Sequence, residues 1–274
     1  KNLKRDLPAS IVVFLVALPL CLGIALASGA PLFAGIVSGV VGGIVVASFS
    51  GSQLSVSGPA AGLTVIVLGA IAQLGSYQTF LLAVMLAGVM QLVLGMIKAG
   101  TIGNYFPSSV IEGMLAAIGL ILILKQLPHA LGVDSDFPGD ESFFQGNEEN
   151  TFSAISGALS HFSLAAIVIS GLSILVLIYW PKIKQVSSIP APLIVVVLGI
   201  ALSFVFKNTT YALEAKQMVA IPVVNGWSEF TGLFTMPDFS AIGKQEVWIV
   251  AGTIAIVASL ETLLSIEAVD KIDP

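Results

Sequence analysis

The sequence predicts an all-α protein that crosses a membrane several times. Hydrophobic residues make up 56% of its 274 residues and charged residues only 10%, and the mean hydropathy is +1.00. Soluble domains carry about 25% charged residues, so a soluble protein with a large core is excluded. Apolar runs of about 20 residues recur along the chain, and a helix of that length is long enough to span the hydrocarbon of a bilayer.

Eight apolar segments are candidate spans. Short turns that contain Gly or Pro separate the first four, and two longer acidic connections, 127–161 and 208–246, follow. The predicted spans are residues 9–28, 32–50, 53–74, 78–98, 107–126, 162–180, 190–207 and 247–269. The distribution of Lys and Arg near the span ends favours a cytoplasmic N-terminus, with both acidic connections outside. We therefore expect a multi-pass protein of the cytoplasmic membrane.

Small residues are concentrated in the second predicted span. Gly35, Gly39, Gly42 and Gly43 fall within it. Glycine lets helix backbones approach closely inside a membrane, so these positions predict tight helix packing.

Several classes of function have no signal in this sequence. No basic patch indicates a nucleic-acid partner, and no Ser/His/Asp, Walker or zinc pattern indicates an enzyme. His129 and His161 lack the spacing of metal ligands. The single cysteine, Cys21, falls in an apolar segment, so a disulfide framework is excluded. We expect neither an enzyme nor a resident metal or cofactor.

The third predicted span is interrupted near its start. The segment QLSVSGPAAGLTV (Gln53–Val65) alternates polar and apolar residues as a strand does, and then breaks at Ser57-Gly58-Pro59. Irregular backbone at membrane depth is tolerated only where protein or a wet cavity surrounds it. We predict a short strand leading into a half-helix that starts near Pro59, with Ser57 as its cap. A continuous helix kinked at the proline is the alternative.

A helix that starts inside the membrane directs free N–H groups and the positive end of its dipole toward the membrane centre. Such a helix start is an anion site. Discontinuous helices of this kind form the substrate sites of secondary transporters. The interruption therefore predicts an anion-binding function.

A carboxylate lies near the middle of the last predicted span. A charge at the bilayer centre costs at least ~2.5–3.5 kcal/mol, so we expect Glu261 to face the protein interior. Ser265 follows one helical turn later, and Thr262 is adjacent. Carboxylate and hydroxyl oxygens suit a small cation such as Na⁺, and a buried carboxylic acid could equally carry a proton. A purely structural hydrogen bond is the alternative role for Glu261.

Four segments resemble, in order, those of the SulP family of inorganic anion transporters. They are LPLCLGIALASGAPLFAGIVSG, VSGPAAGLTV, FPSSVIEGMLAAIGLILILKQLPH and SLETLLSIEAVD. The resemblance implies a fold similar to uracil permease, with fourteen spans in two inverted repeats of seven. It also implies a moving core of helices 1–4 and 8–11 and a gate of helices 5–7 and 12–14.

By this resemblance the chain divides into three parts. Residues 1–100 correspond to core helices 1–4, residues 101–246 to gate helices 5–7 with the two outer connections, and residues 247–274 to core helix 8. The first repeat and helix 8 are thus represented. We expect an incomplete transport domain that lacks helices 9–14 and the cytoplasmic STAS domain of many members.

The resemblance also implies which residues form the sites. The anion would bind at the start of helix 3 and beside helix 1, at Pro19, Leu20, Ile24, Ser57, Gly58, Pro59, Ala60, Ala61 and Gly62. The coupling cation would bind at Glu261, Thr262 and Ser265. Leu20 and Cys21 stand where many relatives carry polar residues, which implies that the anion relies more on backbone donors.

Together these observations predict a secondary active transporter of a small inorganic anion, sulfate or bicarbonate. It would work by symport with H⁺ or Na⁺ through an elevator mechanism, in a lipid bilayer and, by the habit of the family, as a homodimer. Glutamate at position 261, where sodium–bicarbonate members carry aspartate, favours protons. A passive anion channel or exchanger is the alternative, and a membrane scaffold or enzyme is a third reading. Of these possible functions, only transport coupled to a cation requires the carboxylate of Glu261.

Overall fold

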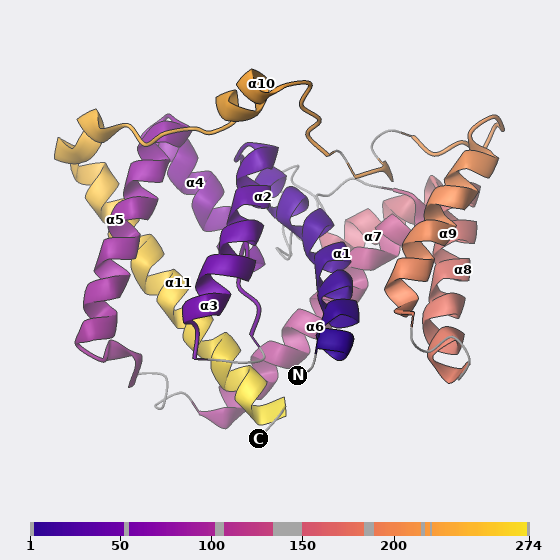
Figure 1. Cartoon of the computed structure of the whole chain (residues 1–274), viewed down its shortest axis with the longest axis horizontal. Helices are drawn as coiled ribbons and strands as arrows, with labels where there is room; N and C mark the ends of the chain where they lie inside the picture. Colours follow the sequence, from indigo (N-terminus) through magenta and orange to yellow (C-terminus); the bar gives the residue numbers. More distant parts are fainter. Residues whose placement is uncertain are drawn as a thin grey trace. The chain divides into compact units, whose positions relative to one another are not determined.

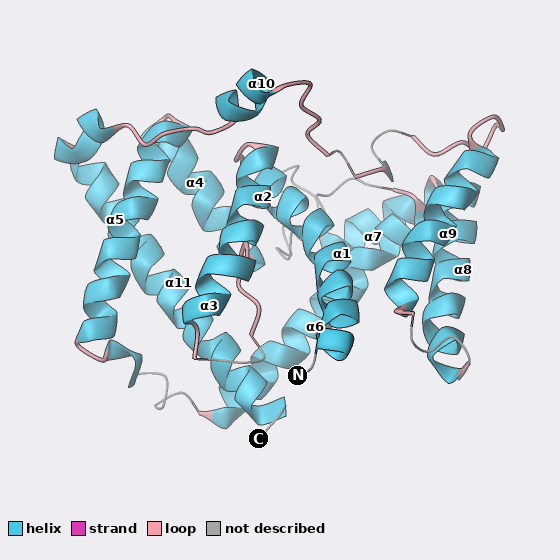
Figure 2. Ribbon diagram, viewed as in Figure 1, coloured by secondary structure: helices cyan, strands magenta, loops and turns pink. Residues whose placement is uncertain are grey.

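The computed structural model describes residues 3–51, 55–101, 107–133, 150–183, 189–214, 217–219 and 221–272. These residues are helical or irregular, and no strand occurs among them (Figure 2). The chain forms two units. The first comprises Lys1–Leu20 and Leu120–Ala220, and the second comprises Cys21–Gly119 and Ile221–Pro274.

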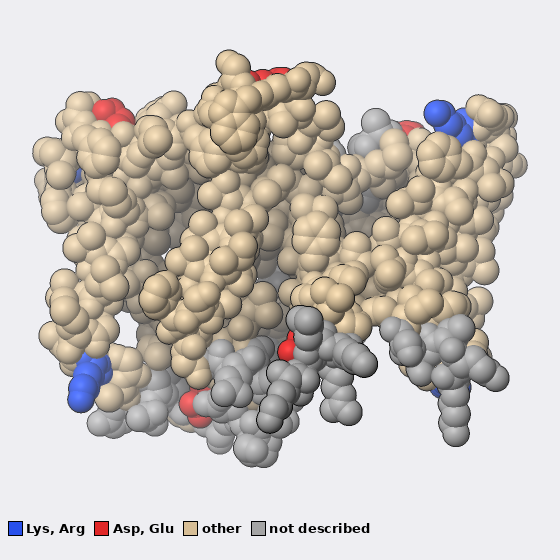
Figure 3. Space-filling view, in the orientation of Figure 1, with Lys and Arg blue, Asp and Glu red and all other residues tan. Residues whose placement is uncertain are grey.

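Five helices in the described part of the chain are long and apolar enough to cross a membrane. They are Asp6–Ala27, Leu32–Phe49, Tyr77–Met96, Leu164–Lys182 and Gln245–Val269. Shorter apolar helices at the other predicted positions are Ala61–Leu74, Ala116–Leu131 and Ala191–Phe206. On the face that Figure 3 shows, most of the described surface carries no charged side chain, and the charged side chains lie toward the upper and lower edges of the view. The chain is a multi-pass membrane protein, as predicted.

The first unit includes the beginning of α1 (Leu3–Ala27), the end of α6 (Ser108–Leu131), α7 (Thr151–Ser160), α8 (Leu164–Tyr179), η4 (Trp180–Lys182) and α9 (Ala191–Phe206). Helices α8 and α9 pack side by side (Figure 1). Gly132, with φ of +83°, ends α6 at a point where an added Cβ would lie 2.6 Å from Ala166 and Ser163. Glycine therefore permits both the left-handed turn and the close packing of α6 on α8.

Helix α7 lies in the connection that the sequence predicts to be a loop. Its N-cap, Asn150, accepts hydrogen bonds from the backbone N–H groups of Phe152 and Ser153, and Ser153 Oγ accepts one from the N–H of Asn150. This reciprocal arrangement is a capping box, which satisfies N–H groups that a short helix leaves free.

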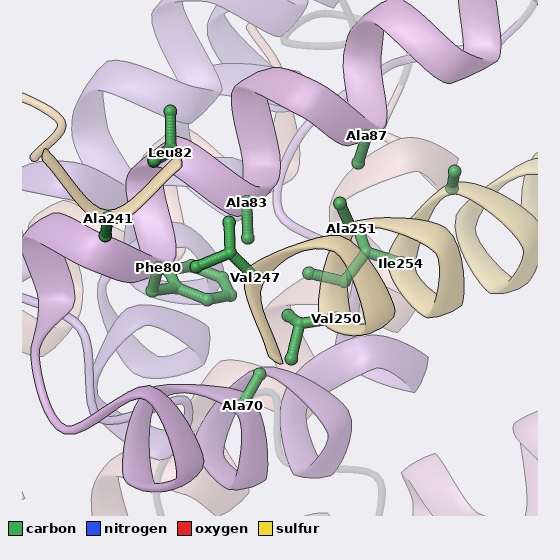
Figure 4. Packing of buried hydrophobic residues seen from close by; sticks show 11 residues of the cluster. Ala70, Phe80, Leu82, Ala83, Ala87, Ala241, Val247, Val250, Ala251 and Ile254 are labelled. Carbon is green, nitrogen blue, oxygen red and sulfur yellow. The ribbon is translucent and has the colours of Figure 1, made fainter. Parts of the chain in front are cut away.

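The second unit includes the end of α1, α2 (Leu32–Val40), the π-helix η1 (Val41–Val46), α3 (Ala47–Phe49), the 3₁₀ helix η2 (Ala61–Leu63), α4 (Thr64–Leu74), α5 (Tyr77–Met96), α10 (Trp227–Gly232), η6 (Phe239–Gly243) and α11 (Gln245–Ile272). Its core lies between α5 and the first half of α11 (Figure 4). Leu82 and Ala83 of α5 and Val247 and Ala251 of α11 are fully buried.

A polar contact extends this packing toward the second half of α11. Gln91 Nε2 of α5 donates hydrogen bonds to Ser259 Oγ at 3.1 Å and to the Ala255 carbonyl at 3.4 Å. A side-chain amide that bonds both a hydroxyl and a backbone carbonyl ties two membrane helices together at a fixed register.

The start of the third span differs from the prediction in two ways. Residues 55–60 are irregular, with no strand among them, and Gln53 and Leu54 lie outside the described residues. The helix begins as η2 at Ala61 and continues as α4 from Thr64, not at Pro59, because Ala60 still has an extended backbone (φ −99°, ψ 118°). Ser57 was predicted to cap the helix and does not: it lies too far before the first turn, which has no side-chain cap.

Candidate functional site

Two glycines of α2 bring the backbones of α1 and α2 together. A Cβ at Gly35 would lie 2.1 Å from the carbonyl oxygen of Cys21, and one at Gly39 would lie 2.7 Å from the Cys21 sulfur. The Cys21 side chain is buried between the two helices, with 6% of its surface exposed. The predicted role of these glycines in helix packing is confirmed.

A third glycine supports the irregular segment before α4. A Cβ at Gly42 would lie 2.2 Å from the Ser57 carbonyl oxygen and 3.1 Å from the Gly58 nitrogen. Gly42 belongs to the π-helix η1, a type of distortion that occurs frequently at functional sites. The backbone of Ser57 and Gly58 therefore lies directly on η1, so protein covers one side of the irregular segment, as membrane depth requires.

The first helical turn that follows is in contact with a carboxylate. The Gly62 N–H donates a hydrogen bond to the Glu261 side chain of α11. An added Cβ at Gly62 would lie 2.7 Å from Glu261 Oε1 and 3.3 Å from its Cδ. The half-buried carboxylate thus occupies the N-terminal end of the helix Ala61–Leu74, where the dipole and free N–H groups favour a negative charge.

Thr64, which the sequence pattern does not single out as a site residue, lies at the same helix start. Only 3% of its surface is exposed, and its hydroxyl has no hydrogen-bond partner among the described residues. An unsatisfied buried polar group costs about 1–3 kcal/mol, so this hydroxyl marks a place where a ligand would find an unused partner. A threonine at the first residue of a broken span is the signal that could have identified it.

The remaining predicted site residues are distributed along α1, the irregular segment and α11. Ile24 is buried in the part of α1 that belongs to the second unit. Pro59, Ala60 and Ala61 are half-buried, Gly58 is exposed, and Pro19 and Leu20 belong to the first unit. Thr262 and Ser265 are exposed on α11. The structure therefore brings together Gly62 and Glu261, and the grouping of the others into an anion site and a cation site stays a prediction.

The surroundings of Glu261 also bear on which cation it could bind. No group of three or more His, Cys, Asp or Glu side chains suited to a metal occurs among the described residues. The contact described for Glu261 is with the N–H donor of Gly62. The coupling cation, H⁺ or Na⁺, stays a prediction.

A helix that begins inside an apolar bundle, with its N-terminus facing a carboxylate, is typical of the substrate sites of secondary transporters. The chain belongs to the sulfate permease family, whose model matches residues 3–273. This finding confirms the family resemblance carried by the four sequence segments.

Two curated relatives match nearly the whole chain. It is 27% identical over 271 residues to "Putative sulfate transporter YvdB" of Bacillus subtilis, covering 99% of this chain and 48% of that protein. It is 26% identical over 282 residues to the bicarbonate transporter BicA of a Picosynechococcus species, covering 99% and 47%. The chain thus spans about half the length of the curated relatives it matches.

A solved structure shares the fold. The transmembrane domain of a cyanobacterial bicarbonate transporter, BicA, superposes with a TM-score of 0.60 at 24% identity, covering 99% of this chain and 66% of that one. The predicted fold class, an all-α polytopic membrane protein of this transporter type, is confirmed.

Proposed function

We propose that the protein is a secondary active transporter of a small inorganic oxyanion, sulfate or bicarbonate, coupled to a cation. The observation that carries the proposal is the hydrogen bond from the Gly62 N–H to the Glu261 carboxylate at the start of a membrane-embedded helix. A donor that holds a carboxylate oxygen can equally hold an oxygen of a substrate anion. The names of the matched relatives, which include sulfate and bicarbonate transporters, support the same substrate class.

The contact between Gly62 and Glu261 links the two predicted sites. Ionised Glu261 occupies the donor that the anion needs, and its charge repels the anion. Two unit charges 4 Å apart repel by roughly 4 kcal/mol at an effective dielectric constant of 20. A proton on Glu261 removes this repulsion and weakens the competing hydrogen bond. Because coupling between two binding events is reciprocal, the bound anion also raises the affinity of Glu261 for the proton.

Protons are the favoured coupling ion in this proposal because a proton on Glu261 removes the charge that repels the anion and weakens the hydrogen bond that occupies the Gly62 N–H. In this proposal the Gly62 N–H binds the anion, the Thr64 hydroxyl supplies a further donor, and Gly42 keeps the preceding backbone in place. The elevator movement of a core past a gate, the cytoplasmic N-terminus in the cytoplasmic membrane and the homodimer are proposed from the family resemblance.

The test is uptake of labelled sulfate and labelled bicarbonate into proteoliposomes that contain the full-length protein carrying this chain. An inward proton gradient should drive the native protein to accumulate one anion above equilibrium. Glu261→Gln should abolish accumulation while leaving downhill flux. Equal accumulation by both proteins would remove Glu261 from coupling. Flux that never exceeds equilibrium in the native protein would favour a channel, and absence of flux for both anions would end the transport proposal.

A glycine pair provides the matched control. Gly62→Ala places a methyl group 2.7 Å from Glu261 Oε1, so it should displace the carboxylate and reduce accumulation at least about tenfold, which corresponds to about 1.4 kcal/mol. Gly69→Ala lies in the same helix with no atom within 4 Å of its added Cβ, and should transport like the native protein. Equal loss in the two variants would attribute the effect to helix α4 as a whole.

A further inference from the structure

An aromatic cluster attaches α10 to the beginning of a membrane span. Phe33, the second residue of α2, makes edge-to-face contacts with Phe230 and Phe234, at centroid distances of 5.6 and 5.0 Å. Trp227 stacks on Phe230 at 5.5 Å. Aromatic pairs of this geometry contribute about 0.5–1.5 kcal/mol each beyond the area they bury. Because the span begins at Leu32, the cluster lies at the level where a helix leaves the hydrocarbon.

The segment around this cluster presents a large apolar surface. Side chains from Ile221 to Met236 with high exposed fractions are Ile221 (54%), Val223 (76%), Trp227 (79%), Phe234 (46%) and Met236 (74%). A shallow hollow of about 440 Å³, lined by Val224, Asn225, Gly226, Trp227 and Phe230, opens on the same segment. Apolar surface of this extent is costly in water, so it needs an apolar neighbour.

The charge of the segment identifies that neighbour. Glu229 is the one ionisable residue between positions 221 and 236, and its carboxylate is held locally by the N–H of Asn225 at 2.8 Å. The segment has no lysine or arginine to attract anionic headgroups, whereas tryptophan and other aromatic residues are enriched where a membrane meets water. The apolar surface is continuous, through Phe33, with a span that already faces lipid.

We infer that Ile221–Met236 lies in the interfacial layer of the bilayer and anchors the beginning of α2 there. This segment belongs to the connection 208–246, which the sequence predicts to lie outside the membrane. Figure 1 shows α10 across the end of the second unit, beside the beginning of α2. Because α2 continues into η1, which supports Ser57 through Gly42, the anchor sets the depth of the irregular segment in the membrane.

The test uses the full-length protein in lipid nanodiscs, with Trp227 as the reporter. Trp180 and Trp248, and any tryptophan elsewhere in the protein, are replaced by Phe. Nitroxide-labelled lipids then quench the fluorescence from the headgroup, from a shallow acyl position or from a deep one. The shallow label should quench Trp227 most, acrylamide should quench it weakly, and neutral and anionic lipids should give the same result. The control carries Ile256→Trp as its single tryptophan, an exposed position in the middle of the span Gln245–Val269, which the deep label should quench most.

Two results would overturn the inference. If acrylamide quenches Trp227 fluorescence strongly and no labelled lipid quenches it, the segment lies in water. If Trp227 is shielded from acrylamide only in nanodiscs that hold two copies of the protein, the surface is a contact between those copies.

Substituting Phe33 tests the anchor independently of depth. Phe33→Ala removes the ring against which Phe230 and Phe234 pack, so Trp227 emission should shift to the red. Phe239→Ala, an exposed aromatic residue on the same connection, should leave the emission unchanged. Circular dichroism establishes that both variants are folded, and an unshifted spectrum in folded Phe33→Ala would contradict the anchor.

Discussion

Within the second unit, close approach of helices is achieved in two different ways. Between α5 and the first half of α11 the contact is made by side chains, and alanines such as Ala83 and Ala251 are fully buried among larger apolar residues (Figure 4). Around the start of α4 the contact is made by backbone and polar groups. There Gly42 lies against the Ser57 carbonyl and Gly62 against the Glu261 carboxylate.

The difference shows which part of the unit is a scaffold and which part is a site. Apolar side-chain packing gives stability and a fixed position but offers nothing to an ion. Backbone N–H groups and a carboxylate can bind an ion, and at Gly62 the two meet because this residue has no Cβ. The Thr64 hydroxyl, two residues further on, has no hydrogen-bond partner among the described residues. Helix α11 belongs to both regions, since it carries Ala251 in one half and Glu261 in the other.

The largest expected effect comes from overfilling the scaffold. Ala251→Leu adds three carbon atoms at a fully buried position, and overpacking of this kind costs typically about 1–3 kcal/mol. The apparent Tm in detergent should therefore fall by several degrees. Thr253→Leu, two residues further on and exposed, should change it little. Similar melting of the two variants would show that the α5–α11 interface is not tightly packed.

A smaller loss of stability, with a larger loss of anion binding, is expected at the site. Gly42→Ala places a methyl group 2.2 Å from the Ser57 carbonyl oxygen, so the backbone before α4 must move. Gly43→Ala is the matched control, because its added Cβ has no atom within 4 Å. Anion affinity, measured by calorimetry on the full-length protein, should weaken in Gly42→Ala and be retained in Gly43→Ala. Equal affinities would mean that η1 does not position the irregular segment.

The smallest expected effect is at the edge of the scaffold, where Asp238 caps η6. The side-chain hydroxyl and backbone N–H of Ser240, together with the charge of Lys244, lower the pKa of Asp238 below its ordinary value of 3.8. A lowered pKa stabilises the folded state above 3.8, and this contribution is lost as the pH falls through the folded-state pKa. Asp238→Ala should therefore lower the apparent Tm slightly at neutral pH.

The Tm difference between the native protein and Asp238→Ala should shrink at acidic pH, as the native carboxyl becomes protonated. Melting curves across this pH range measure it. A difference that is constant with pH would show that the carboxylate charge has no part in the cap.

Most of the fold was predictable because length and hydropathy alone locate membrane helices. The beginning of α4 was not, because the cap rule applied to Ser57 is local, whereas the backbone there rests on Gly42 of a different helix. The short helices α7 and α10 were also missed. A helix of six residues such as α10 is too short to be stable alone, and the contact of Phe33 with Phe230 is a tertiary one.

The candidate site was predictable in its residues but not in its connections. Gly62 and Glu261 were both selected, one for the anion and the other for the cation, and the structure joins them by a hydrogen bond. No local pattern links two positions so far apart in the chain. Thr64 and Gln91 were missed because a threonine or glutamine in an apolar helix is informative only once its burial or its partner is known.

The burial of Cys21 has a practical consequence for following motion in this protein. Its sulfur is covered by α2 at Gly39, so a water-soluble maleimide has no route to the thiol. This sequence contains no other cysteine, and cysteines introduced on η1 or α11 could therefore be labelled one at a time without first altering the native residue. Labelling experiments on this part of the protein can thus leave Cys21 in place.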